Sequence, residues 1–222
     1  MDRHRGILAG IFFIIAAFPA IAALGLYDPV LHDTRYVAEA ARSDAPVLLG
    51  AFLELIVAIS VVGTATTLFP LLRRHSESFA ISYVAGRLVE AIMILTGVLS
   101  LLAVVTLRQD AVGAGALAAG RALVAVHDWT FLLGPGLAIG INTTLLASVV
   151  YRARLAPRGV AALGLAGGPA VFASSVAILF GAYDQVSAIA ALAAFPVFAW
   201  EMSLAGWLIA KGAGAAAPAP AQ

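Results

Sequence analysis

Five charged side chains interrupt stretches of the sequence that are otherwise strongly apolar. They are Glu54, Arg87, Glu90, Asp128 and Glu201. A charge at the centre of a bilayer costs about 2.5–3.5 kcal/mol, so five of them facing lipid alone would cost roughly 12–17 kcal/mol together. We therefore expect them to face the interior of a helix bundle, where they are paired, protonated or bound to a ligand.

Helical spacing predicts that several of these side chains share a face. Tyr83, Arg87 and Glu90 follow an i, i+4, i+7 pattern, which places them on one side of a helix. Asp128 and Asn142 lie close to four helical turns apart, so we expect them on one face, about 21 Å apart along the axis. Asp128 then belongs to an outer layer and Asn142 to an inner one. The candidate ligand-binding residues are Glu54, Tyr83, Arg87, Glu90, His127, Asp128, Asn142 and Glu201.

These candidate residues include more acids than bases, which limits how their charges can be compensated. Four carboxylates face one guanidinium and one titratable histidine, so at least one acid should hold a proton, or a cation should be present. A hard cation held by Glu54, Glu90, Asp128 and Glu201 is chemically possible. The alternative is internal pairing, in which Arg87 binds Glu90 or Glu54 and locks helices together.

Common catalytic motifs are missing from the sequence. It has no HExxH, no GxSxG and no Walker loop, and it has no cysteine that could serve as a nucleophile or thiolate ligand. His127 is the only histidine within a predicted helix, which disfavours a zinc site built on several histidines. The sequence does not identify a cofactor and leaves open whether the protein is an enzyme.

The elements that must position these residues are transmembrane helices. The chain is 62% hydrophobic and 11% charged, more apolar than a water-soluble fold can hide, so the excess must face lipid. The net charge is +1 with no basic run, which argues against nucleic acid as a partner. The expected partners are the lipid bilayer and a small cation or amphiphile. Six apolar stretches have about the 20 residues that a membrane helix needs. They are residues 7–26, 47–72, 79–107, 123–151, 159–181 and 186–210.

The fold class predicted is an all-α integral membrane bundle, because backbone groups in lipid must be satisfied within helices or closed barrels, and barrel strands would alternate polar and apolar residues. Residues 1–212 are expected to form a single six-helix domain, and residues 213–222 a disordered Ala/Pro-rich tail. Asp28 and Pro29 are expected to end the first helix and Pro46 to open the second. The polar segment 30–42 is predicted to be external, either a short surface helix over the bundle or a solvated connector, with the connector favoured. Residues 113–120 are predicted as a flexible loop.

Basic residues are distributed unevenly between the two sides of the predicted bundle. One side carries eight, namely Arg3, Arg5, Arg73, Arg74, Arg152, Arg154, Arg158 and Lys211. The other side carries four, namely Arg35, Arg42, Arg108 and Arg121. The richer side is expected to be cytoplasmic, which places both termini inside.

Three of the predicted helices contain Gly/Pro interruptions. Residues 134–136 (GPG) lie midway along the fourth, 167–169 (GGP) midway along the fifth, and Pro196 precedes Glu201 in the sixth. Such breaks line binding sites in transporters, but glycine and proline are also common in membrane helices, where glycine permits close packing. For any single break, the packing interpretation is favoured.

Several blocks of the sequence resemble a bacterial membrane family catalogued as a domain of unknown function, number 4386. They are LELI at 53–56, LFPLL at 68–72, YVAGRLVEA at 83–91, DWTFLLG at 128–134 and, after Glu201, WLIAKG at 207–212. Glu54, Arg87, Glu90, Asp128 and Glu201 match the polar positions of that family; His127 and Asn142 match it less closely. The resemblance implies a six-helix bundle in a bacterial cytoplasmic membrane and implies no activity.

Three hypotheses for function follow. The leading one is a buried acidic cavity, open toward the outer face, that binds a cation, protons or a small amphiphile in transport or sensing. The second is an intramembrane metal-dependent hydrolase or transferase acting on lipid, with Asp128 or Glu90 as the base. The third is a non-catalytic structural subunit whose charges hold the helices together.

Overall fold

The computed structural model describes residues 3–32, 36, 43–110 and 114–212, and in this part of the chain every regular element is a helix. The helices are α1 (Arg3–His32), α2 (Ala45–Arg73), α3 (Glu77–Asp110), α4 (Ala114–Phe131), the π-helix η1 (Leu132–Ala138), α5 (Ile139–Arg152), α6 (Arg158–Leu179) and α7 (Ala188–Lys211). The predicted segment 30–42 and the tail 213–222 fall largely or wholly outside the described residues.

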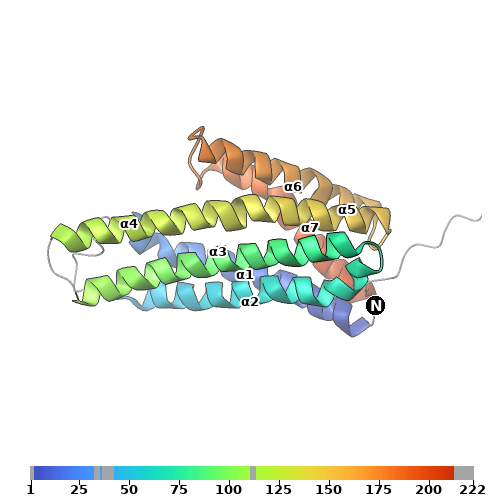
Figure 1. Ribbon diagram of the computed structural model, residues 1–222, viewed down its shortest axis with the longest axis horizontal. Helices are drawn as coiled ribbons and strands as arrows, with labels where there is room; N and C mark the ends of the chain where they lie inside the picture. Colours follow the sequence, from blue (N-terminus) through green and yellow to red (C-terminus); the bar gives the residue numbers. More distant parts are fainter. Residues whose placement is uncertain (1–2, 33–35, 37–42, 111–113, 213–222) are drawn as a thin grey trace, which may run out of the picture.

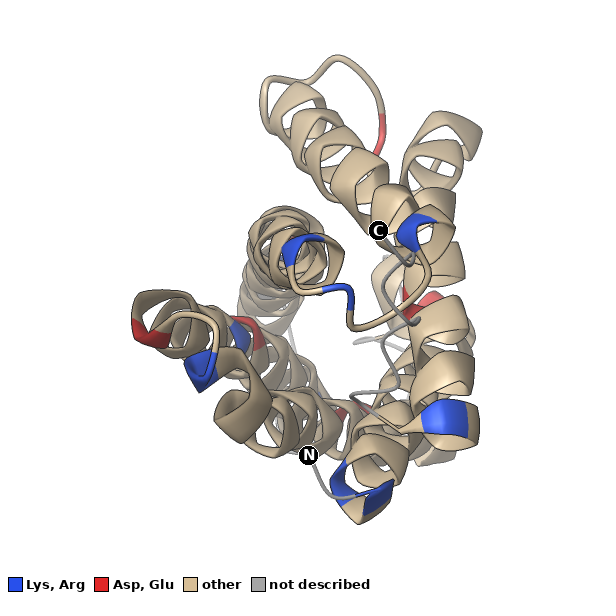
Figure 2. Ribbon diagram, turned by 90° about the vertical axis from the view of Figure 1, so that its right-hand side faces the viewer, with Lys and Arg blue, Asp and Glu red and all other residues tan. Residues whose placement is uncertain are grey.

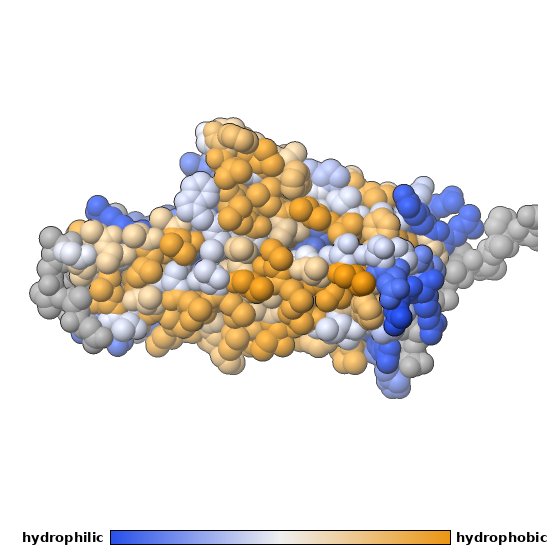
Figure 3. Space-filling view, viewed as in Figure 1, coloured by the Kyte–Doolittle hydropathy of each residue, from blue (hydrophilic) through white to orange (hydrophobic). Residues whose placement is uncertain are grey.

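Six helical stretches are long and apolar enough to cross a membrane, which confirms the predicted fold class. The fourth is formed by α4, η1 and α5 together, from Gly115 to Arg152. On the face shown in Figure 3, apolar side chains form a band between more polar ends. A band of this kind is expected where helices contact lipid.

The six spans form a ring in the order of the sequence. Each span packs against its neighbours along the chain, and α7 packs against α1, so the ring is closed (Figure 2). Gly212, at the end of α7, lies beside Arg3 at the start of α1, so the described ends of the chain meet at one end of the ring. Charged side chains that face the centre of this ring can therefore meet across it.

The helices of the ring differ in length. α3 has 34 residues and α6 has 22, which corresponds to about 51 Å and about 33 Å. The turn between α6 and α7 consequently lies well short of the far ends of α3 and α4 (Figure 1). Because the α6–α7 pair is short, this half of the ring is less completely enclosed than the other half. The charge bias predicts that it is the outer half.

Two predicted helix boundaries are wrong. α1 continues through Asp28 and Pro29 to His32, because a proline removes only one helical hydrogen bond and Tyr27 and Val30 are buried against the bundle. Residues 114–120 are helical and not part of a loop, since α4 begins at Ala114, and residue 113 lies outside the described residues. The small residues there are compatible with a helix that begins outside the core of the bundle. Pro46 does lie in the first turn of α2, as predicted.

The three Gly/Pro interruptions have two different outcomes. α6 runs unbroken through Pro169 and α7 through Pro196. Gly167 and Gly168 instead allow close contact, because an added Cβ would meet backbone atoms of α7 and α5. Only residues 134–136 coincide with a change of helix type, where the chain adopts the π-helix η1. Proline favours such a change because it cannot donate the usual backbone hydrogen bond.

An ion pair joins the start of α2 to the end of α3. Asp44 pairs with Arg108, and it accepts hydrogen bonds from the Tyr36 hydroxyl at 2.8 Å and from the Gln109 amide at 3.1 Å. Burial alone would raise the pKa of Asp44, but the hydrogen bonds from Arg108, Gln109 and Tyr36 and the positive charge of Arg108 outweigh it. The pKa of Asp44 is therefore held below its usual value.

This lowered pKa predicts an acid-dependent loss of stability. The contribution of Asp44 is fully present above the unfolded pKa and is lost as the pH falls through the lower folded pKa. We expect Asp44→Asn to cost about 1–3 kcal/mol near neutral pH, and the difference from wild type to vanish in acid. Melting temperature in detergent against pH measures this. Asp28→Asn is the control, because the Asp28 side chain is 73% exposed and its pair with His32 should contribute little. A pH-independent loss in Asp44→Asn would contradict the prediction.

Candidate functional site

A hydrogen-bonded network occupies the middle of the helix ring, and Arg87 on α3 is its centre. The Arg87 Nε donates to the Tyr83 hydroxyl at 3.1 Å, and Nη1 donates to both carboxylate oxygens of Glu90 at 3.2 Å. Nη2 donates to Oε1 of Glu201, on α7, at 3.0 Å. Each nitrogen of the guanidinium thus has a partner, which is the arrangement that makes a buried arginine tolerable.

The fifth polar member of the network is Asn142 on α5. Its Nδ2 donates to Oε2 of Glu90 at 2.8 Å. The residue opposite is Gly86, where an added Cβ would collide with the Asn142 amide oxygen. Gly86 therefore lets α5 approach α3 closely enough for this bond. The predicted shared face of Tyr83, Arg87 and Glu90 is present, with Asn142 and Glu201 brought to it from other helices.

The surroundings of the network are apolar. Arg87 is 3% exposed, and its guanidinium lies 5.8 Å from the ring centre of Phe13 on α1 and 5.4 Å from that of Tyr83. Aromatic faces at this distance attract a cation. Phe13 was not among the predicted site residues, because an aromatic residue in an apolar helix carries no sequence signal that separates it from ordinary packing.

The network has an unbalanced charge, and two polar atoms in or beside it lack hydrogen-bond partners within the described part of the chain. Two carboxylates surround one guanidinium, so the cluster is formally negative unless one carboxyl holds a proton. Among the described residues, the buried Asn142 Oδ1 and the neighbouring Thr143 Oγ1 have no hydrogen-bond partner. Buried polar atoms of this kind normally have one.

Glu54 belongs to a separate cluster and does not pair with Arg87. Its Oε2 accepts a hydrogen bond from the Tyr27 hydroxyl of α1 at 3.0 Å. The imidazole of His127, on α4, lies edge-on to the Tyr27 ring at 5.6 Å and stacks on Phe131 at 6.2 Å. Glu54 and His127 also line a small cavity of about 10 Å³, which is enough for about one water molecule.

Asp128 does not face the interior as predicted, because 58% of its side chain is exposed. Neighbouring helical residues point in different directions, and it is His127 that is buried. The wider turns of η1 lie between Asp128 and Asn142 and change the helical register on which their predicted shared face depended. Asp128 instead borders a surface hollow of about 160 Å³ with Arg121.

The four candidate metal-binding acids are consequently in three places. Glu90 and Glu201 share the central network, Glu54 lies beside Tyr27, and Asp128 is at the surface. Across the described residues, no three His, Asp or Glu side chains gather closely enough to hold a metal ion. The single acidic cavity that the sequence suggested is not formed by these side chains.

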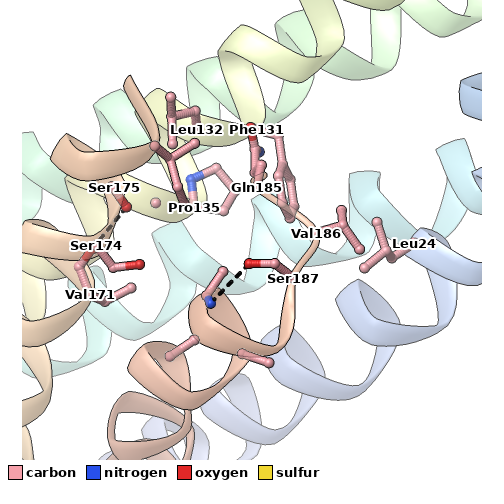
Figure 4. Close-up of a pocket in the computed structure, with 15 residues that line it drawn as sticks. Leu24, Phe131, Leu132, Pro135, Val171, Ser174, Ser175, Gln185, Val186 and Ser187 are labelled. Carbon is pink, nitrogen blue, oxygen red and sulfur yellow. Dashed lines mark hydrogen bonds between the residues drawn. The ribbon is translucent and has the colours of Figure 1, made fainter. Parts of the chain in front are cut away.

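A larger pocket of about 270 Å³ lies where the α6–α7 pair leaves the ring less enclosed (Figure 4). Its apolar walls come from Leu24 of α1, Phe131, Leu132 and Pro135 around η1, Val171 of α6 and the alanines of α7. Its polar groups are Ser174, Ser175, Gln185 and Ser187, and none of the described residues that line it is charged. A sequence signal for this pocket is the glycine–proline–glycine segment at residues 134–136, which by itself indicates a helix break and no pocket.

The fold and the buried network define a multi-pass helical membrane protein with a charged centre. The chain belongs to the family described as Domain of unknown function (DUF4386), whose sequence pattern matches residues 8–212. Comparison with curated proteins and with solved structures gives no significant match.

Proposed function

We propose that this protein binds a small neutral amphiphile in the pocket between α1, η1, α6 and α7, as a carrier or sensor of lipid-like molecules. The observation that supports this proposal most directly is the lining of the pocket. It is mostly apolar, contains hydroxyl and amide groups, and has no charged side chain. Pockets for small molecules commonly combine an apolar wall with a few polar groups that fix orientation.

The polar groups favour one orientation of such a ligand. Gln185 and Ser187 lie in the turn between α6 and α7, whereas Val171 and Ala194 lie at least a helical turn further along their helices. The deeper hydroxyls already have protein partners, since Ser174 accepts a hydrogen bond from the Tyr183 hydroxyl and Ser175 donates one to the Val171 carbonyl. A hydroxyl or ester group would therefore contact the turn, and the hydrocarbon part would extend toward the middle of the ring. The central network lies about 10 Å beyond Ala194, because Glu201 follows it by two turns.

The other hypotheses have less support from the geometry. A metal-dependent hydrolase or transferase needs several ligands in one place, but Glu54, Glu90, Asp128 and Glu201 are dispersed. A purely structural subunit accounts for the Arg87 network but gives no role to an open pocket of about 270 Å³.

Ligand-induced stabilisation tests the proposal. Ala191→Phe fills the pocket, whereas Leu192→Phe is a matched control on the same helix, since Leu192 is 75% exposed and does not line the pocket. We expect a monoacylglycerol with a ten-carbon chain to raise the melting temperature of the wild type and of Leu192→Phe but not of Ala191→Phe. Stabilisation should reach about 2.7 kcal/mol at a hundredfold excess over Kd.

Charged analogues provide the second comparison. Decanoate and decyltrimethylammonium should stabilise the protein less, because the pocket has no charge to pair with them. Equal responses from both phenylalanine variants would contradict the proposal and leave a structural role as the better interpretation.

We further propose that the protein resides in the cytoplasmic membrane of a bacterium with both termini inside. The support is the bias of eight basic residues to four. A reporter active only in the cytoplasm should work when fused after Gln222 and fail when inserted near Gly115. The reverse pattern would contradict the orientation, and with it the placement of the pocket in the outer half.

A further inference from the structure

A line of polar side chains leads from the surface of α4 to the buried carboxylate of Glu54. It begins at Asp128, whose side chain is 58% exposed and borders the hollow that also contains Arg121. The Nδ1 atom of His127 lies 3.4 Å from Oδ1 of Asp128. His127 is 4% exposed, so its imidazole connects an exposed carboxylate to the interior.

The small cavity continues this line inward. It is bordered by both Glu54 and His127 and has room for about one water molecule. A water there would have polar partners on two sides, which is the condition for a stable buried water. Glu54 is 9% exposed and its other neighbour is the Tyr27 hydroxyl, 3.0 Å from Oε2.

No other ionisable group described in the structure faces Glu54. α1 contributes Tyr27 and α4 contributes His127, with Asp128 behind it. α3 borders the cavity with Met93, Ile94 and Gly97. The nearest charges on α3 are Arg87 and Glu90, one to two turns away and bound to each other. Glu54 is thus a carboxylate with no cation bound to it, and the described polar groups connect it to the surface through His127.

We propose that Glu54 is a proton-binding site that is loaded from the Asp128 side through His127 and one water molecule in the cavity. The Asp128 carboxyl takes a proton from solvent and donates it to Nδ1 of neutral His127. His127 releases its Nε2 proton to the water, which donates one of its own to Glu54. The imidazole ends as its other tautomer, and the net change is one proton moved from solvent to Glu54. Imidazole is suited to this role because both nitrogens can carry the proton.

This proton site does not depend on the proposed amphiphile pocket. The two cavities share Phe131 and Pro135 as a common wall, but the relay residues Glu54, His127 and Asp128 do not line the larger pocket. Filling that pocket with Ala191→Phe should therefore leave proton binding at Glu54 in place. Failure of one proposal would not imply failure of the other.

Infrared spectroscopy of the full-length protein in nanodiscs after a pH jump tests the inference, since a protonated carboxyl has a carbonyl band that the carboxylate lacks. We expect one component of the pH-dependent carbonyl absorption to be missing in Glu54→Gln, because other protonated carboxyls contribute the remainder. His127→Phe should slow the appearance of this component by roughly a hundredfold while leaving its final amplitude unchanged, because a proton relay acts on the rate. Asp128→Asn should also slow it, and the exposed neighbour Trp129→Phe should not.

Each alternative outcome is decisive. If no component of the absorption is lost in Glu54→Gln, the proton belongs to another acid. If the rate is unchanged in His127→Phe, the proton takes another route. Either result overturns the proposal. Should Glu54→Gln fail to fold, Tyr27→Phe provides the second variant, because it removes the hydrogen bond to Glu54 and must change the midpoint of the band. An unchanged midpoint would likewise overturn the assignment.

Discussion

Arg87→Met is expected to reduce the free energy of unfolding by about 3–5 kcal/mol, the range observed when one member of a buried ion pair is removed. The guanidinium donates to Tyr83, Glu90 and Glu201, so its loss leaves two carboxylates together in the middle of the ring with no cation. Methionine has similar length and no charge, so the change in packing is kept small. Thermal unfolding in detergent measures the effect.

Double variants identify the partners of Arg87. Adding Glu90→Gln or Glu201→Gln to Arg87→Met should recover part of the lost stability, because each removes one of the stranded carboxylates. Adding Glu54→Gln is the matched control, since Glu54 binds Tyr27 and lies in another cluster. Contacting residues show interaction energies of about 0.5–3 kcal/mol, whereas independent sites add within about 0.5 kcal/mol. Strict additivity in all three doubles would contradict the network.

The membrane spans and one face of the network could be predicted because both depend on local sequence. A run of apolar residues identifies a span without reference to any other part of the chain. The i, i+4, i+7 spacing of Tyr83, Arg87 and Glu90 likewise holds wherever α3 is a helix. These features follow from the geometry of a single helix and were confirmed.

The partners contributed by other helices could not be predicted from the sequence. Glu201 reaches Arg87 from 114 residues away, whereas the sequence indicated Glu90 or Glu54 as the partner. That choice depends on the order of helices around the ring, which hydropathy does not report. No sequence signal identifies the Tyr27 hydroxyl as the partner of Glu54, because tyrosine near the end of a membrane helix is normally an interface residue.

The prediction that the Asp128 side chain faces the interior is wrong because it assumes that the fourth span is one regular α-helix. Fourteen residues make close to four α-helical turns only when every turn is α-helical. The π-helix η1 lies within that interval, and the residues before it are rotated relative to α5. The amphiphile pocket was missed for a related reason, since it depends on η1 and on the short α6–α7 pair.

Gly168→Ala is expected to destabilise the protein, because Gly168 lies where α6 packs closely against α5. An added Cβ would overlap Thr144 Oγ1 and would lie 2.8 Å from the Gly140 carbonyl oxygen and 2.9 Å from the Thr144 backbone nitrogen. Backbone atoms cannot rotate away as a side chain can, so the two helices must separate. Overpacking of this kind costs about 1–3 kcal/mol and occasionally more.

Gly206→Ala is the matched control for this substitution. It is also a glycine-to-alanine change within a long helix, but no heavy atom lies within 4 Å of the added Cβ. Alanine is favoured over glycine by about 1 kcal/mol in a helix, so Gly206→Ala should leave stability unchanged or raise it slightly. The difference in melting temperature between the two variants then isolates the close contact from the helix propensity that both share.

The contact at Gly168 also connects the packing of α6 to the pocket. Val171, Ser174 and Ser175 follow Gly168 by one to two turns and line the pocket wall. If α6 moves away from α5, that wall moves with it. The stabilisation by monoacylglycerol should therefore weaken in Gly168→Ala and persist in Gly206→Ala. Equal melting temperatures and equal ligand responses in the two variants would contradict both the close contact and its role in shaping the pocket.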